Sequence, residues 1–219
     1  EEILVRNESV YVGVADGVGS WRQYGVDPKE FSHSLIKNAE RIVKMDSEHR
    51  AWSSSVGVGF TVALGIREQE AIHPLDVIID AWTATLNDNV VGSSTFCVAT
   101  LDDNTNTLSY SNIGDGGVLV VRRIDPLVAG SSRSYSTTSS EDSELQIVFL
   151  SQQQLQGFNL PYQLGFSNKD GQPKSFNSPS DADTGSIPVV PGDVIVIATD
   201  GLFDNVSLDD IVDEIKKWE

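Results

Sequence analysis

The sequence contains a single cysteine, Cys97, among its 219 residues. One thiol cannot form a disulfide within the chain, so a disulfide-stapled fold is excluded. Cys97 lies in the run STFCVA at 94–99, whose apolar and β-branched residues predict a buried strand. A thiol in such a strand is usually structural rather than nucleophilic, so Cys97 is predicted to be a core residue.

Basic residues are scarce. The 15 Lys and Arg residues stand against 32 Asp and Glu residues, which gives a formal net charge of -17. A surface of this sign repels nucleic acid backbones and anionic lipid. Nucleic acid is therefore not a predicted partner, whereas metal cations and basic partners would be attracted.

Long apolar runs are absent as well. No run approaches the ~18 residues that indicate a membrane span, and no basic, apolar signal segment opens the chain. The first residues, Glu1 and Glu2, are interpreted as a processed or trimmed end. A length of 219 residues with 39% hydrophobic residues predicts one globular domain with a sizeable core.

Three segments place apolar residues at helical spacing. The first begins at Pro28 with Asp27 as its cap, the second spans 74–87, and the third follows Ser207 in a capping-box pattern. Their predicted buried faces are Phe31, Leu35, Ala39 and Ile42 in the first, Leu75, Ile78, Ile79, Trp82 and Leu86 in the second, and Ile211, Val212, Ile215 and Trp218 in the third.

Strands are predicted where β-rich runs are bounded by turn residues. They cover 3–5, 10–14, 95–101, 107–112, 118–122 and 193–198. The glycine-rich link 113–117 predicts a hairpin between its two flanking strands. Short loops between successive strands indicate antiparallel pairing, since parallel strands need long crossovers. The predicted fold class is therefore α+β, with helices packed on antiparallel sheet.

The Ser-rich stretch GSSRSYSTTSSEDS at 130–143 predicts a mobile insertion between strands, because its polar composition cannot bury enough apolar surface to order it. No internal repeat and no second domain are apparent. The chain is interpreted as one domain over 1–219 that carries this insertion.

Two Asp-Gly pairs each follow an apolar strand: VYVGVADG ends at Gly17 and VIVIATDG ends at Gly201. An Asp at the end of a buried strand is costly unless its charge is compensated. A divalent cation such as Mg²⁺ or Mn²⁺, which prefers oxygen ligands, would compensate it. One Asp-Gly pair alone is more often a turn, but two pairs with a third carboxylate, Asp115, favour a metal site.

Four motifs stand in an order that resembles the type-2C, metal-dependent (PPM) protein phosphatases. They are ADGVGS at 15–20, GSST at 92–95, NIGD at 112–115 and ATDGLFDN at 198–205. Two longer stretches, ADGVGSWRQYGVDPKEFS at 15–32 and FNLPYQLGF at 158–166, are similar to the mitochondrial branch of this family, which is linked to coenzyme Q biosynthesis.

The resemblance implies an αββα sandwich, in which helices flank two antiparallel sheets. It implies hydrolysis of phosphoserine and phosphothreonine in proteins by water activated at a binuclear Mg²⁺ or Mn²⁺ centre. It also implies a mitochondrial matrix location, with phosphoprotein substrates among coenzyme Q biosynthesis proteins.

Residue by residue, Asp16 matches the carboxylate that bridges the two metals, and Gly17 would add its carbonyl to one of them. Asp200 matches a ligand of one catalytic metal. Asp115 matches an acidic residue that helps bind a third, weaker metal in some members, although a turn Asp is equally well explained as structural. Asp204 is assigned no direct role.

The sequence departs from the family pattern in three places. An acidic ligand normally precedes the first Asp-Gly motif, and a further Asp normally follows the last one. Both are expected to lie outside 1–219, so the domain is interpreted as truncated at both ends. In many relatives a proton-donating His follows the first Asp-Gly, but Val18 stands there.

Two other classes remain open. A phosphatase-fold module that binds a partner without catalysis would suit a chain that lacks the outer ligands. A plain Ca²⁺-binding protein is disfavoured, because the Asp-x-Asp-x-Asp-Gly loop of an EF-hand is missing. The histidines His33, His49 and His73 lie outside the motifs and are not assigned to catalysis.

Overall fold

A computed structural model describes residues 2–6, 9–55, 71–124 and 144–218. Its larger sheet has five strands in the order β1-β2-β4-β5-β11. Their bounds are Glu2–Arg6, Ser9–Val14, Phe96–Asp102, Thr107–Ile113 and Asp183–Pro188. The second sheet has the order β12-β6-β7, with bounds Val194–Ala198, Gly117–Ile124 and Glu144–Leu150. The Ser-rich stretch 130–143 lies outside the described residues.

Two short ribbons complete the described strands. One pairs β3 (Gly92–Ser94) with β10 (Leu164–Phe166), and the other pairs β8 (Leu155–Gly157) with β9 (Leu160–Pro161). Every strand pair in the described part of the chain is antiparallel, as the short loops predicted.

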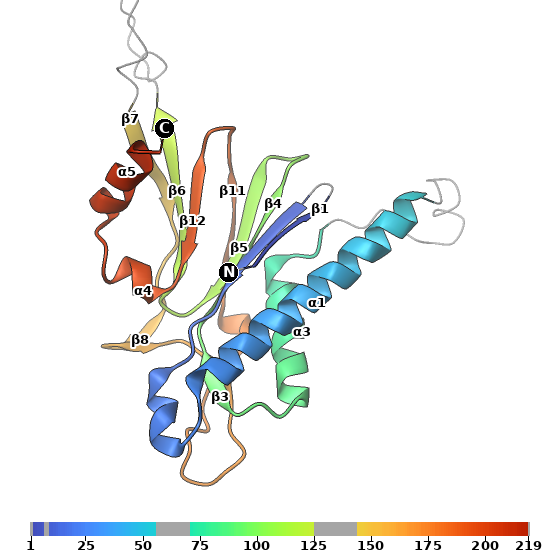
Figure 1. Cartoon of the computed structure of the whole chain (residues 1–219), viewed down its shortest axis with the longest axis vertical. Helices are drawn as coiled ribbons and strands as arrows, with labels where there is room; N and C mark the ends of the chain where they lie inside the picture. The colour runs from blue at the N-terminus through green and yellow to red at the C-terminus, as the bar shows by residue number, and fades with distance from the viewer. Residues whose placement is uncertain (1, 7–8, 56–70, 125–143, 219) are drawn as a thin grey trace, which may run out of the picture.

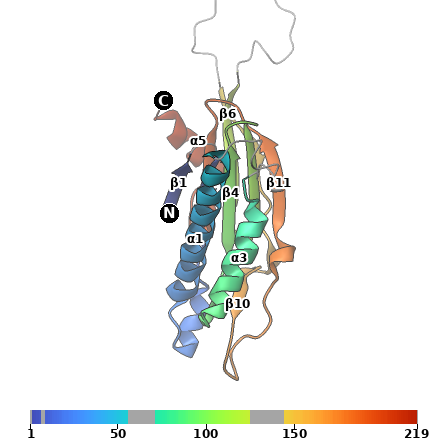
Figure 2. The ribbon, with the colours of Figure 1, turned by 90° about the vertical axis from the view of Figure 1, so that its right-hand side faces the viewer.

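Helices cover the outer face of each sheet, as Figure 1 shows. The helices α1 (Pro28–Ser55) and α3 (Pro74–Asn87) lie side by side over the five-stranded sheet, facing the viewer in Figure 2. They bury Phe31, Leu35 and Ile78 against the five-stranded sheet. On the other side, α5 (Leu208–Lys216) packs Ile211 and Val212 against Leu119 and Val121 of the smaller sheet.

A third cluster fills the space between the sheets. It contains Cys97, Ala99, Leu108, Tyr110, Val118 and Val120. Cys97 is buried there, and burial raises the pKa of its thiol to about 12, so the prediction of a structural thiol is confirmed. The helix, sheet, sheet and helix layers make an α+β sandwich, which confirms the predicted fold class.

The predicted hairpin at 113–117 is wrong. β5 pairs with β4 and β11 in one sheet, whereas β6 pairs with β12 and β7 in the other. The link therefore crosses between the layers. A glycine-rich link of five residues fits a hairpin or a crossing equally well, and the tertiary packing selects the crossing.

Two predicted buried faces also need correction. In α3 the buried residues are Pro74, Val77, Ile78, Ala81 and Thr85, while Ile79 is 38% exposed. In α5, Ile211 and Val212 are buried, but Trp218 lies beyond the last turn and is 85% exposed. Apolar residues occupy neighbouring positions in both helices, so periodicity alone could not choose the buried set.

The helix starts agree with their cap signals. Asp27 accepts a hydrogen bond from the Lys29 backbone N–H at 3.0 Å, and Ser207 accepts one from Asp210 at 3.1 Å. His73 caps α3 by accepting from the Leu75 backbone N–H at 3.2 Å. Among the described helices, none is long and apolar enough to cross a bilayer.

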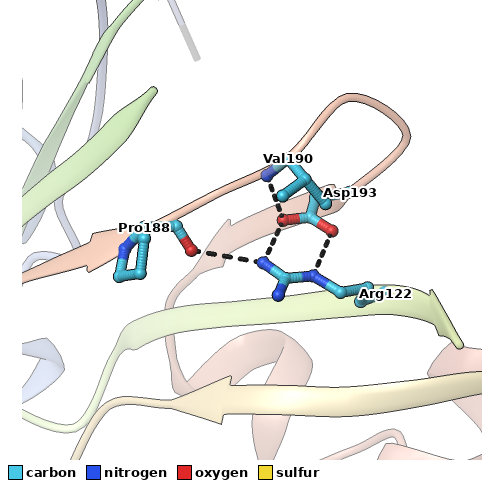
Figure 3. A network of polar contacts seen from close by, with 4 residues as sticks. All are labelled: Arg122, Pro188, Val190 and Asp193. Atoms are coloured by element: carbon cyan, nitrogen blue, oxygen red, sulfur yellow. Dashed lines mark hydrogen bonds and ion pairs between the residues drawn. The ribbon is translucent and has the colours of Figure 1, made fainter. Parts of the chain in front are cut away.

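One ion pair ties the two sheets together (Figure 3). On β6, Arg122 donates through Nε and Nη2 to the two carboxylate oxygens of Asp193, each at 2.8 Å. Its Nη2 also donates to the carbonyl of Pro188 at the end of β11, at 3.2 Å. Asp193 further accepts from the Val190 backbone N–H at 2.9 Å. The guanidinium thus joins a strand of each sheet to the turn before β12.

We expect Asp193→Asn to lower the free energy of unfolding by about 2 kcal/mol at pH 7, the range for a charge-assisted pair. The Asp193 side chain is only 2% exposed, and hydrogen bonding to Arg122 lowers its pKa. A carboxyl with a lowered folded-state pKa stabilises the fold above its unfolded pKa of about 3.9, and this contribution is lost as the pH falls through the folded value.

Urea unfolding of the wild type and of Asp193→Asn at pH 7, 5 and 3 measures the difference between their free energies of unfolding. This difference should be equal at pH 7 and 5 and smaller at pH 3. Asp213→Asn is the control, because the Asp213–Lys216 pair is exposed on both sides and should matter little. A difference that stays constant down to pH 3 would contradict the electrostatic explanation.

Candidate metal centre

Asp16 follows β2 and is held through its backbone. Its carbonyl accepts from the Thr95 N–H at 3.0 Å and from the Ser94 hydroxyl at 2.8 Å. Its own N–H donates to Thr95 Oγ1 at 3.3 Å. The GSST segment therefore satisfies both backbone groups of Asp16, and its carboxylate is left to face the pocket.

Gly17 is required by close packing. A Cβ at this position would lie 2.6 Å from the carbonyl carbon of Pro28, and closer still to its oxygen. Pro28 is the first residue of α1, so the start of that helix presses on the backbone next to Asp16. Only glycine fits this approach.

Asp200 begins the short helix α4 (Asp200–Phe203), directly after β12. Thr199 caps this helix by accepting from the Gly201 N–H at 3.3 Å. Asp204 caps its other end, and its N–H donates to the Asp200 carbonyl at 2.8 Å. These contacts fix the turn that carries the Asp200 carboxylate, and Asp204 supports that turn through its backbone.

Asp115 lies on the link 113–117 that crosses between the sheets, and it lines the same pocket as Asp16 and Asp200. A Cβ on Gly116 would lie 2.8 Å from the Ala198 carbonyl oxygen, so the link rests on the end of β12. Asn112 holds it by donating to the carbonyls of Gly114 at 3.1 Å and Gly116 at 2.9 Å. Asp115, which is 6% exposed, is thereby brought beside Asp200.

The electrostatics show that these carboxylates share one environment. Burial raises the pKa of Asp16, and a hydrogen bond from its carboxyl group to that of Asp200, together with the charge of Asp200, raises it further. Burial and then the charge of Asp200 raise the pKa of Asp115 to about 6. Carboxylates this close cannot all stay ionised without a proton or a cation between them.

Asp16, Asp115 and Asp200 line a pocket of about 650 Å³, and their part of it is called the carboxylate end. The lining that follows Asp16 in the chain, called the first wall, includes Val18, Ser20 and Trp21. The lining from later in the chain, called the second wall, includes Gln156, Asn159, Leu160, Pro161, Gln163 and Phe176. No Lys, Arg or His is among the described residues that line the pocket, so no side chain there offsets the negative charge.

This donor set fits a divalent cation, because carboxylate oxygens are the ligands that Mg²⁺ and Mn²⁺ prefer. Within the described ranges, however, no three His, Cys, Asp or Glu side chains are gathered closely enough to hold a metal ion by themselves. Asp16, Asp115 and Asp200 would thus supply part of a coordination sphere, completed by water or by other ligands. The Asp16 and Asp200 carboxyl groups are in contact, and a bound cation would offset their charges.

The structure also shows pocket residues that the motifs did not identify. Trp21, which follows the first Asp-Gly motif, is both buried and pocket-lining. Gln163 lies within the stretch 158–166, which was given no site role, and Phe176 lies outside every motif. His33 is exposed and His73 caps α3, so neither contributes to the pocket.

The chain is similar in sequence to known phosphatases. It is 35% identical over 209 residues to "Protein phosphatase PTC7 homolog" of Xenopus laevis. The alignment covers 94% of this chain and 56% of that protein. The chain therefore spans a little over half the length of this relative. No family model matches the chain.

Solved structures show the same fold. The photosystem II phosphatase PBCP superposes with a TM-score of 0.66 at 25% identity, over 99% of this chain and 64% of that one. The serine-threonine phosphatase 2C of Toxoplasma gondii gives a TM-score of 0.51 at 14% identity, over 97% and 74%, which speaks for the fold alone. In its sequence relatives and its fold, the chain is similar to the type-2C (PPM) protein phosphatases.

Proposed function

We propose that the protein hydrolyses phosphoserine and phosphothreonine in other proteins. The observation that carries this proposal is the contact of Asp16 with Asp200, with Asp115 beside them, at the end of a pocket whose described lining has no basic side chain. Relatives named protein phosphatase support it. Turnover without a protein nucleophile suits the site, since Cys97 is buried away from the pocket.

Two Mg²⁺ or Mn²⁺ ions bound at these carboxylates would lower the pKa of a water molecule, orient the phosphate and offset its charge. Asp16, the Gly17 carbonyl and Asp200 would hold these ions, and Asp115 would help to hold a third. The oxygen of water bonds to phosphorus while the bond to the Ser or Thr oxygen breaks. That oxygen gains a proton, and the products are phosphate and a hydroxyl side chain.

Val18 lines the pocket where many relatives carry a proton-donating His, and an isopropyl group cannot supply a proton. The leaving oxygen therefore needs another donor in this protein. We further infer a mitochondrial matrix location and substrates among coenzyme Q biosynthesis proteins, supported by the likeness of 15–32 and 158–166 to that branch of the family.

Metal dependence tests the proposal. The purified protein should hydrolyse p-nitrophenyl phosphate and a phosphothreonine peptide with Mn²⁺ or Mg²⁺, lose this activity in EDTA and regain it when metal is restored. Mn²⁺ should also raise the melting temperature, because a cation that binds only the folded carboxylates stabilises them. Activity that survives EDTA would refute the proposal. A stable, metal-binding protein without turnover would favour a binding module.

A further inference from the structure

The Ser93 hydroxyl joins the two walls of the pocket. It accepts a hydrogen bond from Trp21 Nε1 at 2.6 Å and donates one to Gln163 Oε1 at 2.5 Å. Ser93 itself is 0% exposed and is not among the pocket-lining residues, whereas Trp21 and Gln163 both line the pocket. The hydroxyl therefore lies behind the pocket surface and touches one residue of each wall.

Trp21 belongs to the first wall and lies in the 3₁₀ helix η1 (Gly19–Tyr24). Its ring stacks on Phe176 with centroids 6.3 Å apart and planes at 23°. Phe176 in turn lies against Gly165, and a Cβ on Gly165 would be 2.5 Å from the Phe176 ring. The indole is thus held by a stack on one side and by the Ser93 hydroxyl at its N–H.

Gln163 belongs to the second wall and is fixed along its length. Its backbone N–H donates to Asn177 Oδ1 at 3.1 Å, and its Nε2 donates to the Pro161 carbonyl at 3.3 Å. Asn177 Oδ1 also accepts from Gln156 Nε2 at 2.8 Å. The Ser93 contact adds the link from this network to the rest of the pocket.

The strand β3, which contains Ser93, also contacts the backbone of the candidate metal site. The Ser93 carbonyl accepts from the Val18 N–H at 3.0 Å, and the next two residues, Ser94 and Thr95, bond to Asp16. β3 therefore connects the carboxylate end of the pocket with both walls, and Ser93 is the member of β3 whose side chain reaches them.

We propose that Ser93 is a positioning residue for substrate binding, an inference that rests on the proposed phosphatase function. Acting through Trp21 and Gln163, it holds these two pocket-lining residues in place and so fixes the shape of the pocket beyond the carboxylates, where the chain on either side of a phosphorylated residue would lie. Removing its hydroxyl leaves a buried donor and a half-buried acceptor without this partner, which favours their movement. A small substrate that occupies only the carboxylate end would be little affected.

Ser93→Ala should raise KM for a phosphothreonine peptide about tenfold and change kcat/KM for p-nitrophenyl phosphate less than about twofold, the pattern of lost binding rather than lost chemistry. Trp21→Phe keeps a ring against Phe176 but removes the N–H donor, and should give a similar split. If the two residues act as one unit, the double variant should be no worse than the more impaired single variant.

A spectroscopic readout separates positioning from general destabilisation. The Trp21 indole N–H resonance, assigned by its loss in Trp21→Phe, should move upfield in Ser93→Ala as the short hydrogen bond is lost. Ser111→Ala is the matched control, because Ser111 is also fully buried but its hydroxyl has no hydrogen-bond partner among the described residues. It should alter neither the indole resonance nor the substrate preference.

The outcomes are distinguishable. A wild-type protein that hydrolyses neither substrate with metal overturns the proposed function. An active wild type in which Ser93→Ala slows both substrates by the same factor, or leaves peptide KM unchanged, overturns the positioning role alone. An unmoved indole resonance shows that the hydroxyl contact is absent in solution and overturns it as well.

Discussion

Asp16→Asn should reduce turnover of p-nitrophenyl phosphate and of a phosphothreonine peptide by about a thousandfold or more, as expected when a central ligand of a metal-assisted reaction is lost. The amide has nearly the shape of the carboxylate but carries no charge to bind or bridge cations. Because the Asp16 backbone is held by Ser94 and Thr95, the substitution should leave the fold in place.

The metal-free Asp16→Asn protein should melt at the same temperature as wild type or higher. Asp16 and Asp200 are like charges in contact, and both burial and that neighbour disfavour the ionised form of Asp16. A neutral amide removes this repulsion. Lost turnover with undiminished stability separates a role in function from a role in folding, and thermal melts in EDTA and in Mn²⁺ measure it.

Asp115→Asn is the matched variant, since it makes the same chemical change in the neighbouring buried carboxyl. Asp115 is proposed to assist a weaker, third cation, so turnover should fall less than in Asp16→Asn and should recover in part at higher Mn²⁺ concentration. If Asp16→Asn kept more than about a tenth of wild-type activity at saturating metal, the bridging role would be wrong.

Gly17→Ala should destabilise the fold by about 3 kcal/mol and strongly reduce activity, which is the upper range for overpacking a tight contact. The added methyl group would meet the backbone of Pro28 rather than a flexible side chain. Either the start of α1 or the end of β2 must move, and the second change displaces Asp16. For a domain of this size the melting temperature should fall by roughly 6–12 °C.

Gly19→Ala is the control for stability, because a Cβ on Gly19 would meet nothing within 4 Å. It should shift the melting temperature by no more than a few degrees in either direction, as substitutions away from tight contacts usually do. Equal losses in the two variants would show that glycine is needed there for chain flexibility, and not because of the approach of Pro28.

Local signals in the sequence were strong enough to predict most elements. The start of α1 at Pro28 and the bounds of α3 at 74–87 agree with the structure, because caps, prolines and helical periodicity act within a few residues. The same is true of the strands that end at the Asp-Gly motifs. Since Asp16 and Asp200 each follow such a strand, their pairing was predicted from the motifs.

Contacts between distant segments needed the tertiary structure. The sequence alone determined an acidic α+β chain with antiparallel strands, a buried thiol and three marked aspartates. Only the packing decided that 113–117 crosses between the sheets, that Ile79 and Trp218 stay exposed, and that Ser93 joins Trp21 to Gln163. Period and propensity specify which face a residue takes within its own element, whereas the choice of partner depends on which surfaces the whole chain can bury together.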